Sequence, residues 1–253
     1  MKVDYSPVQW QAILQKAEAI RLACPGPVAR HLNKRISIPI SLRLLRLGIH
    51  PNWITFFNMI LGISSGFFVA QATYGMMLLG GFIFQLASIL DGCDGEVAKL
   101  SGKTSKVGQY LDTLSDNGAL VSFLIGLLTV FGKTHTTGEL AWASVLLTLG
   151  AVGILFHIIY FLKTETDSAS LTTFYKEYLS KLPRDRFKPM MGVLDFGTVM
   201  LRKDCTTLFF FALTVFGILD WGVYLAIAAT WVGIFILTFL KMVPQYEQKS
   251  TPI

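Results

Sequence analysis

The chain has 253 residues, of which 53% are hydrophobic and 15% are charged, and its net charge is +6. With a mean hydropathy of +0.54, this composition is typical of an integral membrane protein and excludes a disordered chain. Its 3 cysteines are too dispersed to indicate a disulfide framework, and no basic platform with interleaved aromatic residues favours nucleic-acid binding.

The first 50 residues predict interfacial amphipathic helices that lie along a membrane surface. Trp10, Ile13 and Ala17 recur at helical spacing, and Pro25-Gly26-Pro27 interrupts the pattern. Residues 29–36 and 41–46 then mix basic and apolar faces, as in helices that bind at a lipid interface. Such helices serve either as anchors or as gates for a substrate, and the sequence leaves both roles open.

The remainder of the chain predicts an all-α fold with six transmembrane helices. We expect a catalytic transmembrane domain over 51–243 and a short tail over 244–253, with a face at Gly62 and Gly66 for close helix contact. The apolar segments of roughly spanning length, the fifth of them short, are 52–72, 75–98, 109–131, 140–162, 205–219 and 220–242.

The basic residues predict the orientation of these helices. A cytoplasmic N-terminus places every one of the 22 lysines and arginines except Lys133 on the cytoplasmic side or at its interface. This asymmetry is what the positive-inside rule requires. We therefore expect a multi-pass protein of the inner membrane, with both termini and the basic face in the cytoplasm, where it meets anionic lipid headgroups.

Aspartates cluster between uncharged runs. Residues 75–90 and 117–132 carry no charge, and a carboxylate beside hydrocarbon is costly to keep ionised unless a partner charge, water or a metal receives it. Carboxylates cannot neutralise one another, so a cation is the expected partner. The aspartates form two pairs, Asp91 with Asp94 and Asp112 with Asp116. The members of a pair are three or four residues apart, so each pair shares one face of its helix.

Two glycines lie one helical turn from these pairs. Gly95 shares a face with Asp91, and Gly108 precedes Asp112, so each leaves open space beside a carboxylate. If the two helices are antiparallel, the pairs face each other. Oxygen ligands without histidine or cysteine suit Mg²⁺ or Mn²⁺, and two ions about 3.5–4 Å apart could clamp a phosphoryl group.

This arrangement resembles the signature of the CDP-alcohol phosphotransferases (CDP-alcohol phosphatidyltransferases), Asp-x2-Asp-Gly-x2-Ala-Arg-x8-Gly-x3-Asp-x3-Asp. Lys99 replaces the arginine of the pattern, which keeps the charge and loses the planar bidentate group. Lys99 and the nearby Lys103 and Lys106 are either diphosphate contacts or ordinary positive-inside charges, and we favour a ligand role for Lys99 and, second to it, for Lys106. The matching positions are Asp91, Asp94, Gly95, Ala98, Gly108, Asp112 and Asp116.

The resemblance implies an enzyme that transfers a substituted phosphate from a CDP-linked donor to an alcohol and releases CMP. It further implies a homodimer and two Mg²⁺ (or Mn²⁺) ions held by Asp91, Asp94 and Asp112, with Asp116 as the base assisted by its metal. The positions expected to bind the nucleotide are Asn52, Thr55, Gly95, Ala98, Lys99 and Gly108.

The acceptor is less well defined by the sequence. Residues 33–39 and 91–96 resemble the branch that joins CDP-inositol to inositol phosphate, although a phospholipid synthase that uses CDP-diacylglycerol fits the core motif equally. A phosphorylated acceptor near four carboxylates needs basic partners, and the candidates are Lys163, Arg202 and Lys203. The alternative from another class is an ion-coupled transporter, which would place its carboxylates near the membrane midplane.

Overall fold

The computed structural model describes residues 3, 5–24, 26–164, 199 and 202–242, and the predicted tail lies outside them. The described residues form helices and no strand, which confirms the all-α prediction. In chain order the elements are α1 (Pro7–Leu22), the π-helical segment η1 (Ala29–Asn33), α2 (Lys34–Arg46), α3 (Pro51–Ala70), α4 (Tyr74–Ser101), α5 (Lys106–Thr134), α6 (Thr137–Thr164), α9 (Lys203–Val215) and α10 (Trp221–Met242).

Among the described residues, four helices are long and apolar enough to cross a membrane: α3, α4, α5 and Thr137–His157 of α6. The apolar part of α10, Trp221–Ile236, is shorter. Helix α9 has 13 residues and is about 20 Å long at 1.5 Å per residue, against about 30 Å of hydrocarbon. The chain is therefore a multi-pass membrane protein, and its helices lie where the six segments were predicted.

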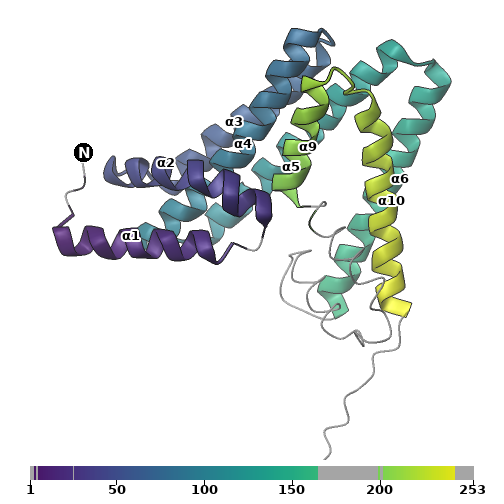
Figure 1. Cartoon of the computed structure of the whole chain (residues 1–253). Coiled ribbons are helices and arrows are strands. Elements are labelled where there is room, and N and C mark those ends of the chain that lie inside the picture. Colours follow the sequence, from purple (N-terminus) through teal and green to yellow (C-terminus); the bar gives the residue numbers. More distant parts are fainter. Residues whose placement is uncertain (1–2, 4, 25, 165–198, 200–201, 243–253) are drawn as a thin grey trace, which may run out of the picture. The chain divides into compact units, whose positions relative to one another are not determined.

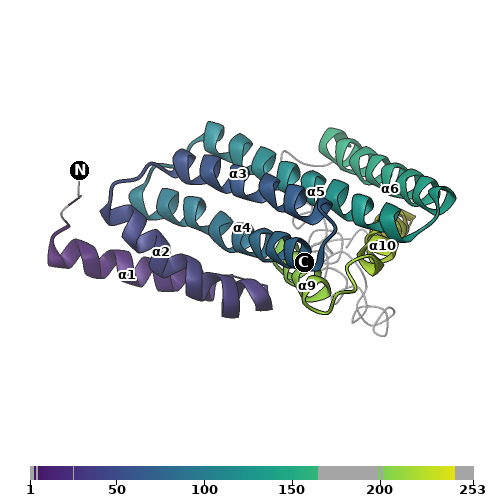
Figure 2. The same ribbon diagram turned by 90° about the horizontal axis from the view of Figure 1, so that it is seen from above.

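The chain forms two compact units, the first made of Met1–Thr136 with Arg202–Gly222 and the second of Thr137–Leu201 with Val223–Ile253. In the first unit, α3 packs against both α4 and α5 (Figures 1 and 2). In the second, the indole of Trp231 on α10 donates to the Leu146 carbonyl of α6, and His157 Nε2 lies 3.1 Å from Thr238 Oγ1.

Small residues allow α3 to approach its neighbours closely. A methyl group at Gly62 would lie 2.6 Å from the Ala119 Cβ of α5 and 3.8 Å from the Ala87 Cβ of α4, and one at Gly66 would overlap the Ser122 backbone. The Ser122 hydroxyl donates to the Ile63 carbonyl at 2.7 Å. These contacts confirm the predicted face at Gly62 and Gly66 and fix α3 against α5.

Within the first unit, the N-terminal helices pack against α4 through apolar residues. Helix α1 begins with a capping box between Ser6 and Gln9. Its Ile13 forms a buried cluster with Leu45 of α2 and Val97 of α4. The apolar face predicted to lie on the membrane is thus occupied, at this point, by protein.

A polar contact joins α1 to the end of α4. The ammonium group of Lys16 donates to the Lys99 carbonyl at 2.6 Å. A cation there complements the partial negative charge of the last carbonyls of a helix. Helix α1 is thereby held beside the end of α4 that carries the aspartates.

Candidate active site

The aspartates lie on either side of the short connection between α4 and α5. Gly102, with φ +70°, ends α4 in the left-handed conformation that glycine adopts at little cost. Ser105 caps the N-terminus of α5, and its side chain accepts a hydrogen bond from the Gly108 N–H at 3.0 Å. Asp94 and Asp112 lie in the turns on either side of this connection, whereas Asp91 and Asp116 lie nearer the middle of their helices.

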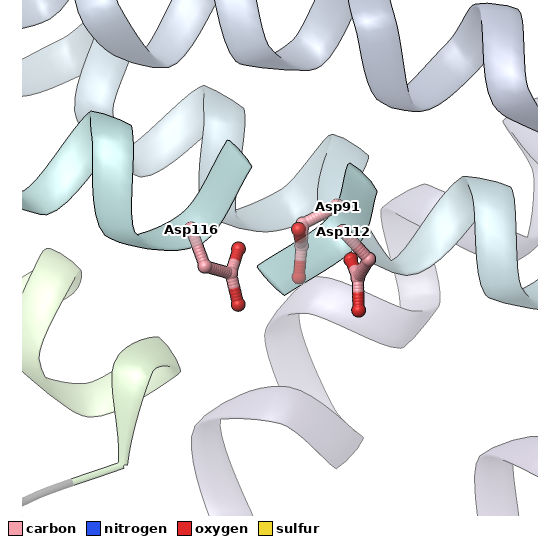
Figure 3. Close-up of side chains that lie close together, drawn as sticks. All are labelled: Asp91, Asp112 and Asp116. Carbon is pink, nitrogen blue, oxygen red and sulfur yellow. The ribbon is translucent and has the colours of Figure 1, made fainter. Parts of the chain in front are cut away.

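Three carboxylates converge on one point. Asp91 of α4 and Asp112 and Asp116 of α5 each offer an oxygen, and these oxygens lie within 4.8 Å of one another (Figure 3). Each side chain is partly buried. Ligand distances of about 2.0–2.6 Å to Mg²⁺ or Ca²⁺ match an oxygen cluster of this size, so the residues present fit a hard divalent cation.

Asp94, the fourth predicted ligand, lies outside that group. It is buried and accepts a hydrogen bond from the Thr55 hydroxyl of α3, and the Gly95 N–H donates to its Oδ1 at 2.5 Å. Asp94 and Asp112 both line the neighbouring cleft. The structure therefore separates the predicted quartet into a cluster of three and a carboxylate that faces the cleft.

The cleft, of about 550 Å³ including space that opens to solvent, gathers every position predicted to bind the nucleotide. The Thr55 hydroxyl, however, already donates a hydrogen bond to Asp94. The N-terminus of α3 is capped by His50, whose side chain accepts from the Asn52 N–H. The predicted residues along its wall are Asn52, Thr55, Gly95, Ala98, Lys99 and Gly108.

The two glycines of the cleft differ in their surroundings. A side chain at Gly95 would meet nothing within 4 Å. At Gly108 a Cβ would lie 3.1 Å from Ser105 Oγ and 3.2 Å from Asn52 Oδ1. Gly95 thus keeps the cleft open, whereas Gly108 lets α5 approach α3.

Lys203, at the start of α9, pairs with the carboxylate cluster. Its ammonium nitrogen lies 3.0 Å from Asp91 Oδ1 and also forms an ion pair with Asp116. It therefore supplies one positive charge among the carboxylates. Of the predicted acceptor-phosphate ligands whose side chains the structure describes, Lys203 is the one at the aspartates.

The other two candidates are placed differently. The Arg202 guanidinium pairs with Asp204, with 3.2 Å between Nε and Oδ1. Asp204 in turn accepts from the Ala29 N–H at 2.8 Å and so fastens η1 to α9. Lys163 belongs to the last turn of α6, but its side chain lies outside the described residues.

Sequence reasoning missed Asn58, the second polar partner that α3 offers to α4. Its amide nitrogen lies 3.5 Å from Asp91 Oδ1. Thr55 and Asn58 are three residues apart, as are Asp91 and Asp94. In antiparallel helices this matched spacing pairs Thr55 with Asp94 and Asn58 with Asp91, and it is a signal that the sequence contains.

Glu96 was also missed, although it belongs to the aspartate motif. Its side chain is 2% exposed, and it pairs with Lys34 at 2.6 Å and accepts from the hydroxyls of Ser37 and Ser41 at 2.7 and 2.6 Å. The three partners share one face of α2 at spacings of three and four. Glu96 therefore anchors α2 to α4 two residues beyond Asp94.

Comparison with known proteins places this geometry in a family. The family model of the CDP-alcohol phosphatidyltransferases matches residues 48–239, which is most of the chain. The bifunctional IPC transferase and DIPP synthase of Archaeoglobus fulgidus is 34% identical over 123 residues, covering 49% of this chain and 24% of that protein. The protein of the same name from Thermococcus kodakarensis is 42% identical over 106 residues, covering 42% of this chain and 23% of that one.

A third relative is the archaetidylinositol phosphate synthase of Pyrococcus horikoshii, 33% identical over 89 residues, which cover 35% of this chain and 45% of the relative. The chain thus aligns with about a quarter of the two bifunctional proteins and under half of this one. The match to the family model includes all four aspartates, the cleft beside them and the helices that carry both. By this match the chain belongs to the CDP-alcohol phosphatidyltransferase family.

Proposed function

We propose that the protein is a membrane-embedded, metal-dependent CDP-alcohol phosphotransferase. The observation that carries this proposal is the convergence of Asp91, Asp112 and Asp116 beside a cleft of about 550 Å³ that Asp112 also lines. A cation-binding cluster and an open cleft that share one wall suit a reaction at a diphosphate. Family membership supplies the reaction class.

In the proposed reaction, the acceptor hydroxyl oxygen attacks the β-phosphorus of the donor. A new P–O bond forms to the acceptor, the bond from that phosphorus to the bridging oxygen breaks, and CMP leaves with that oxygen. Asp116, as implied by the family signature, accepts the hydroxyl proton. Its position on α5, beside Asp91, is consistent with this role.

Two divalent ions, Mg²⁺ or Mn²⁺, would stabilise the negative charge on the reacting phosphoryl group and the leaving CMP. Asp91 and Asp112 would hold them together with Asp94, and Asp116 would act as a ligand as well as a base. Asp94 is positioned for this by Thr55. Lys203 offsets part of the carboxylate charge.

The cleft is the proposed site of the cytidine nucleotide. Gly95 and Ala98 provide open wall, Gly108 brings α5 close to Asn52, and Lys99 and Lys103 add positive charge near the diphosphate. The departure from arginine at Lys99 leaves a point charge suited to a phosphate oxygen.

For the acceptor we propose a phosphorylated alcohol of the inositol-phosphate type. Support comes from similarity to proteins named IPC transferase and DIPP synthase, and archaetidylinositol phosphate synthase. Lys203 is the candidate for contact with its phosphate because its ammonium group lies among the aspartates. Arg202 and Lys163 remain secondary candidates.

The proposed setting is the inner membrane, with six spans and the active site facing the cytoplasm. Helices at all six predicted places and the confinement of the lysines and arginines, except Lys133, to one predicted side support this topology. A homodimer rests on the family resemblance alone, because the glycine face of α3 is filled within the chain.

The alternative of an ion-coupled transporter is set aside. The family to which the chain belongs is one of phosphatidyltransferases. The aspartates also lie on two continuous helices, in the halves next to the short connection, whereas carriers bind their ions near the midplane between broken helices.

The test is CMP release by purified protein with a panel of CDP-linked donors and phosphorylated or unphosphorylated alcohols, with Mg²⁺ or with EDTA. We expect Mg²⁺-dependent release that is abolished by Asp91→Asn, Asp94→Asn or Asp112→Asn, together with weaker metal binding. Asp116→Asn should abolish turnover at a smaller cost in donor binding. Near-normal turnover in these variants would refute the assignment.

A further inference from the structure

Asn58 is a buried polar residue whose hydrogen-bonding capacity is only partly used. Its side chain is 5% exposed, and its amide nitrogen reaches Asp91 Oδ1 at 3.5 Å. Among the described residues, its carbonyl oxygen has no hydrogen-bond partner. A buried carbonyl without a donor is unfavourable and rare in native proteins.

The orientation of the amide is fixed by charge. Rotating the amide by half a turn would place the carbonyl oxygen of Asn58 against the carboxylate of Asp91, where two acceptors would repel each other. With the nitrogen toward Asp91, the carbonyl is the atom that still needs a donor. No rearrangement of the amide itself removes this need.

The register of α3 against α4 makes Asn58 part of the site. Thr55 donates to Asp94, and Asn58, one turn further along α3, donates to Asp91, one turn earlier on α4. The glycine contact of α3 with Ala87, another turn along, continues the same alignment. Asp91 and Asp94 therefore each have their own donor on α3.

Two donors converge on the same oxygen of Asp91. Asn58 Nδ2 lies 3.5 Å from Oδ1, and Lys203 Nζ lies 3.0 Å from that atom. A carboxylate held by one oxygen in this way presents its other oxygen in a fixed direction. Partners of this kind orient ligands and raise metal affinity elsewhere in proteins.

We propose that Asn58 is a positioning residue of the cation site. Its nitrogen holds Asp91 Oδ1, so that Oδ2 faces the cation, and its carbonyl oxygen accepts a hydrogen bond from a water at the buried side of the ion. This inference rests on the proposed function, since it takes the aspartate cluster to be a cation site.

The test is Mn²⁺ binding by detergent-solubilised, full-length protein, measured from the electron paramagnetic resonance signal of free Mn²⁺ without donor or acceptor. Asn58→Leu removes both the donor and the unpartnered carbonyl in a side chain of similar size. We expect an approximately tenfold weaker Mn²⁺ affinity, the lower end of the range for such partners, with a Tm in EDTA that is unchanged or higher.

Asn33 provides the matched control. It is also buried, at 6% exposed, but its amide is satisfied by Ser88 at 3.5 Å and by Gln85 at 3.4 Å. Asn33→Leu should lower the Tm, because it leaves these partners unpaired, while Mn²⁺ affinity stays within about twofold. The two asparagines are therefore expected to show opposite patterns.

Equal Mn²⁺ affinity in the wild type and Asn58→Leu would overturn the proposal, as would equal weakening in both leucine variants. If Asn58→Leu does not fold, Asn58→Ser, which keeps a small polar side chain but cannot span the distance, is measured against the same criteria. Asp91→Asn separates the two levels of inference. Loss of Mn²⁺ binding in Asp91→Asn with full binding in the Asn58 variant rejects only the role of Asn58, whereas unchanged binding in Asp91→Asn rejects the cation site itself.

Discussion

Gly95 offers a way to block the proposed nucleotide cleft without disturbing the fold. It lies on α4 between Asp94 and Glu96, lines the cleft, and has nothing within 4 Å of the position of a Cβ. A Cβ at this position displaces no protein atom, so Gly95→Leu should extend its side chain into the cleft. Replacing a helix-interior glycine by a good helix former should raise the free energy of unfolding by up to about 1 kcal/mol.

The substitution should also weaken donor binding and so raise the KM for the donor. Overfilling a packed site costs about 1–3 kcal/mol, and about 1.4 kcal/mol corresponds to a factor of ten. The donor KM should rise by roughly 5- to 150-fold. The assay is Mg²⁺-dependent CMP release at varied donor concentration, accompanied by a thermal unfolding measurement in the same detergent.

Gly75→Leu is the matched control, because Gly75 lies on the same helix, near its other end, and also has nothing within 4 Å. Its donor KM should equal that of the wild type. An unchanged donor KM in a folded Gly95→Leu variant would show that the nucleotide does not use this cleft. A large drop in Tm would refute the view that Gly95 faces open space.

Two further predictions concern the residues around the cleft. Glu96→Gln should lower the free energy of unfolding by about 3 kcal/mol, because it leaves the partly buried Lys34 ammonium without its buried counter-charge. The exposed pair of Glu18 with Arg21 makes Glu18→Gln the control, with no measurable change in Tm, and equal effects of the two variants in chemical denaturation would contradict the anchoring role. Lys99→Arg should retain much of the kcat/KM for the donor and Lys99→Ala should lose most of it, if the contribution is mainly charge; equal kcat/KM in all three proteins would mean that this position makes no contact with the donor.

The positions of the helices, and the residues that line the cleft, could be predicted from the sequence. Apolar runs, the proline before Asn52 and the glycine of the α4–α5 connection are local signals, and the observed helix limits lie within a few residues of the predicted ones. The family signature likewise named the cleft residues Gly95, Ala98 and Gly108, because spacing within one helix determines which side chains share a face.

What the sequence left open depends on contacts between distant segments. Asp94 shares its motif with Asp91, yet it binds Thr55 and leaves the cluster of three, because α3 places a hydroxyl beside it. Lys203, predicted to bind a phosphate, lies against the carboxylates. Both outcomes depend on how helices pack across more than 30 residues of sequence, which local patterns do not specify.

The alignment of α3 with α4 has a consequence for how such chains tolerate insertions. The polar pairs and the glycine contact hold the two helices in step through side chains, and the turn between Ala70 and Tyr74 lies at the opposite end of α3 from Thr55 and Asn58. Residues added in that turn would lengthen the chain without shifting the phase of either helix. We therefore expect the alignment to depend on the spacing within each helix, where three residues separate Thr55 from Asn58 and three separate Asp91 from Asp94. The number of residues in the turn should matter little.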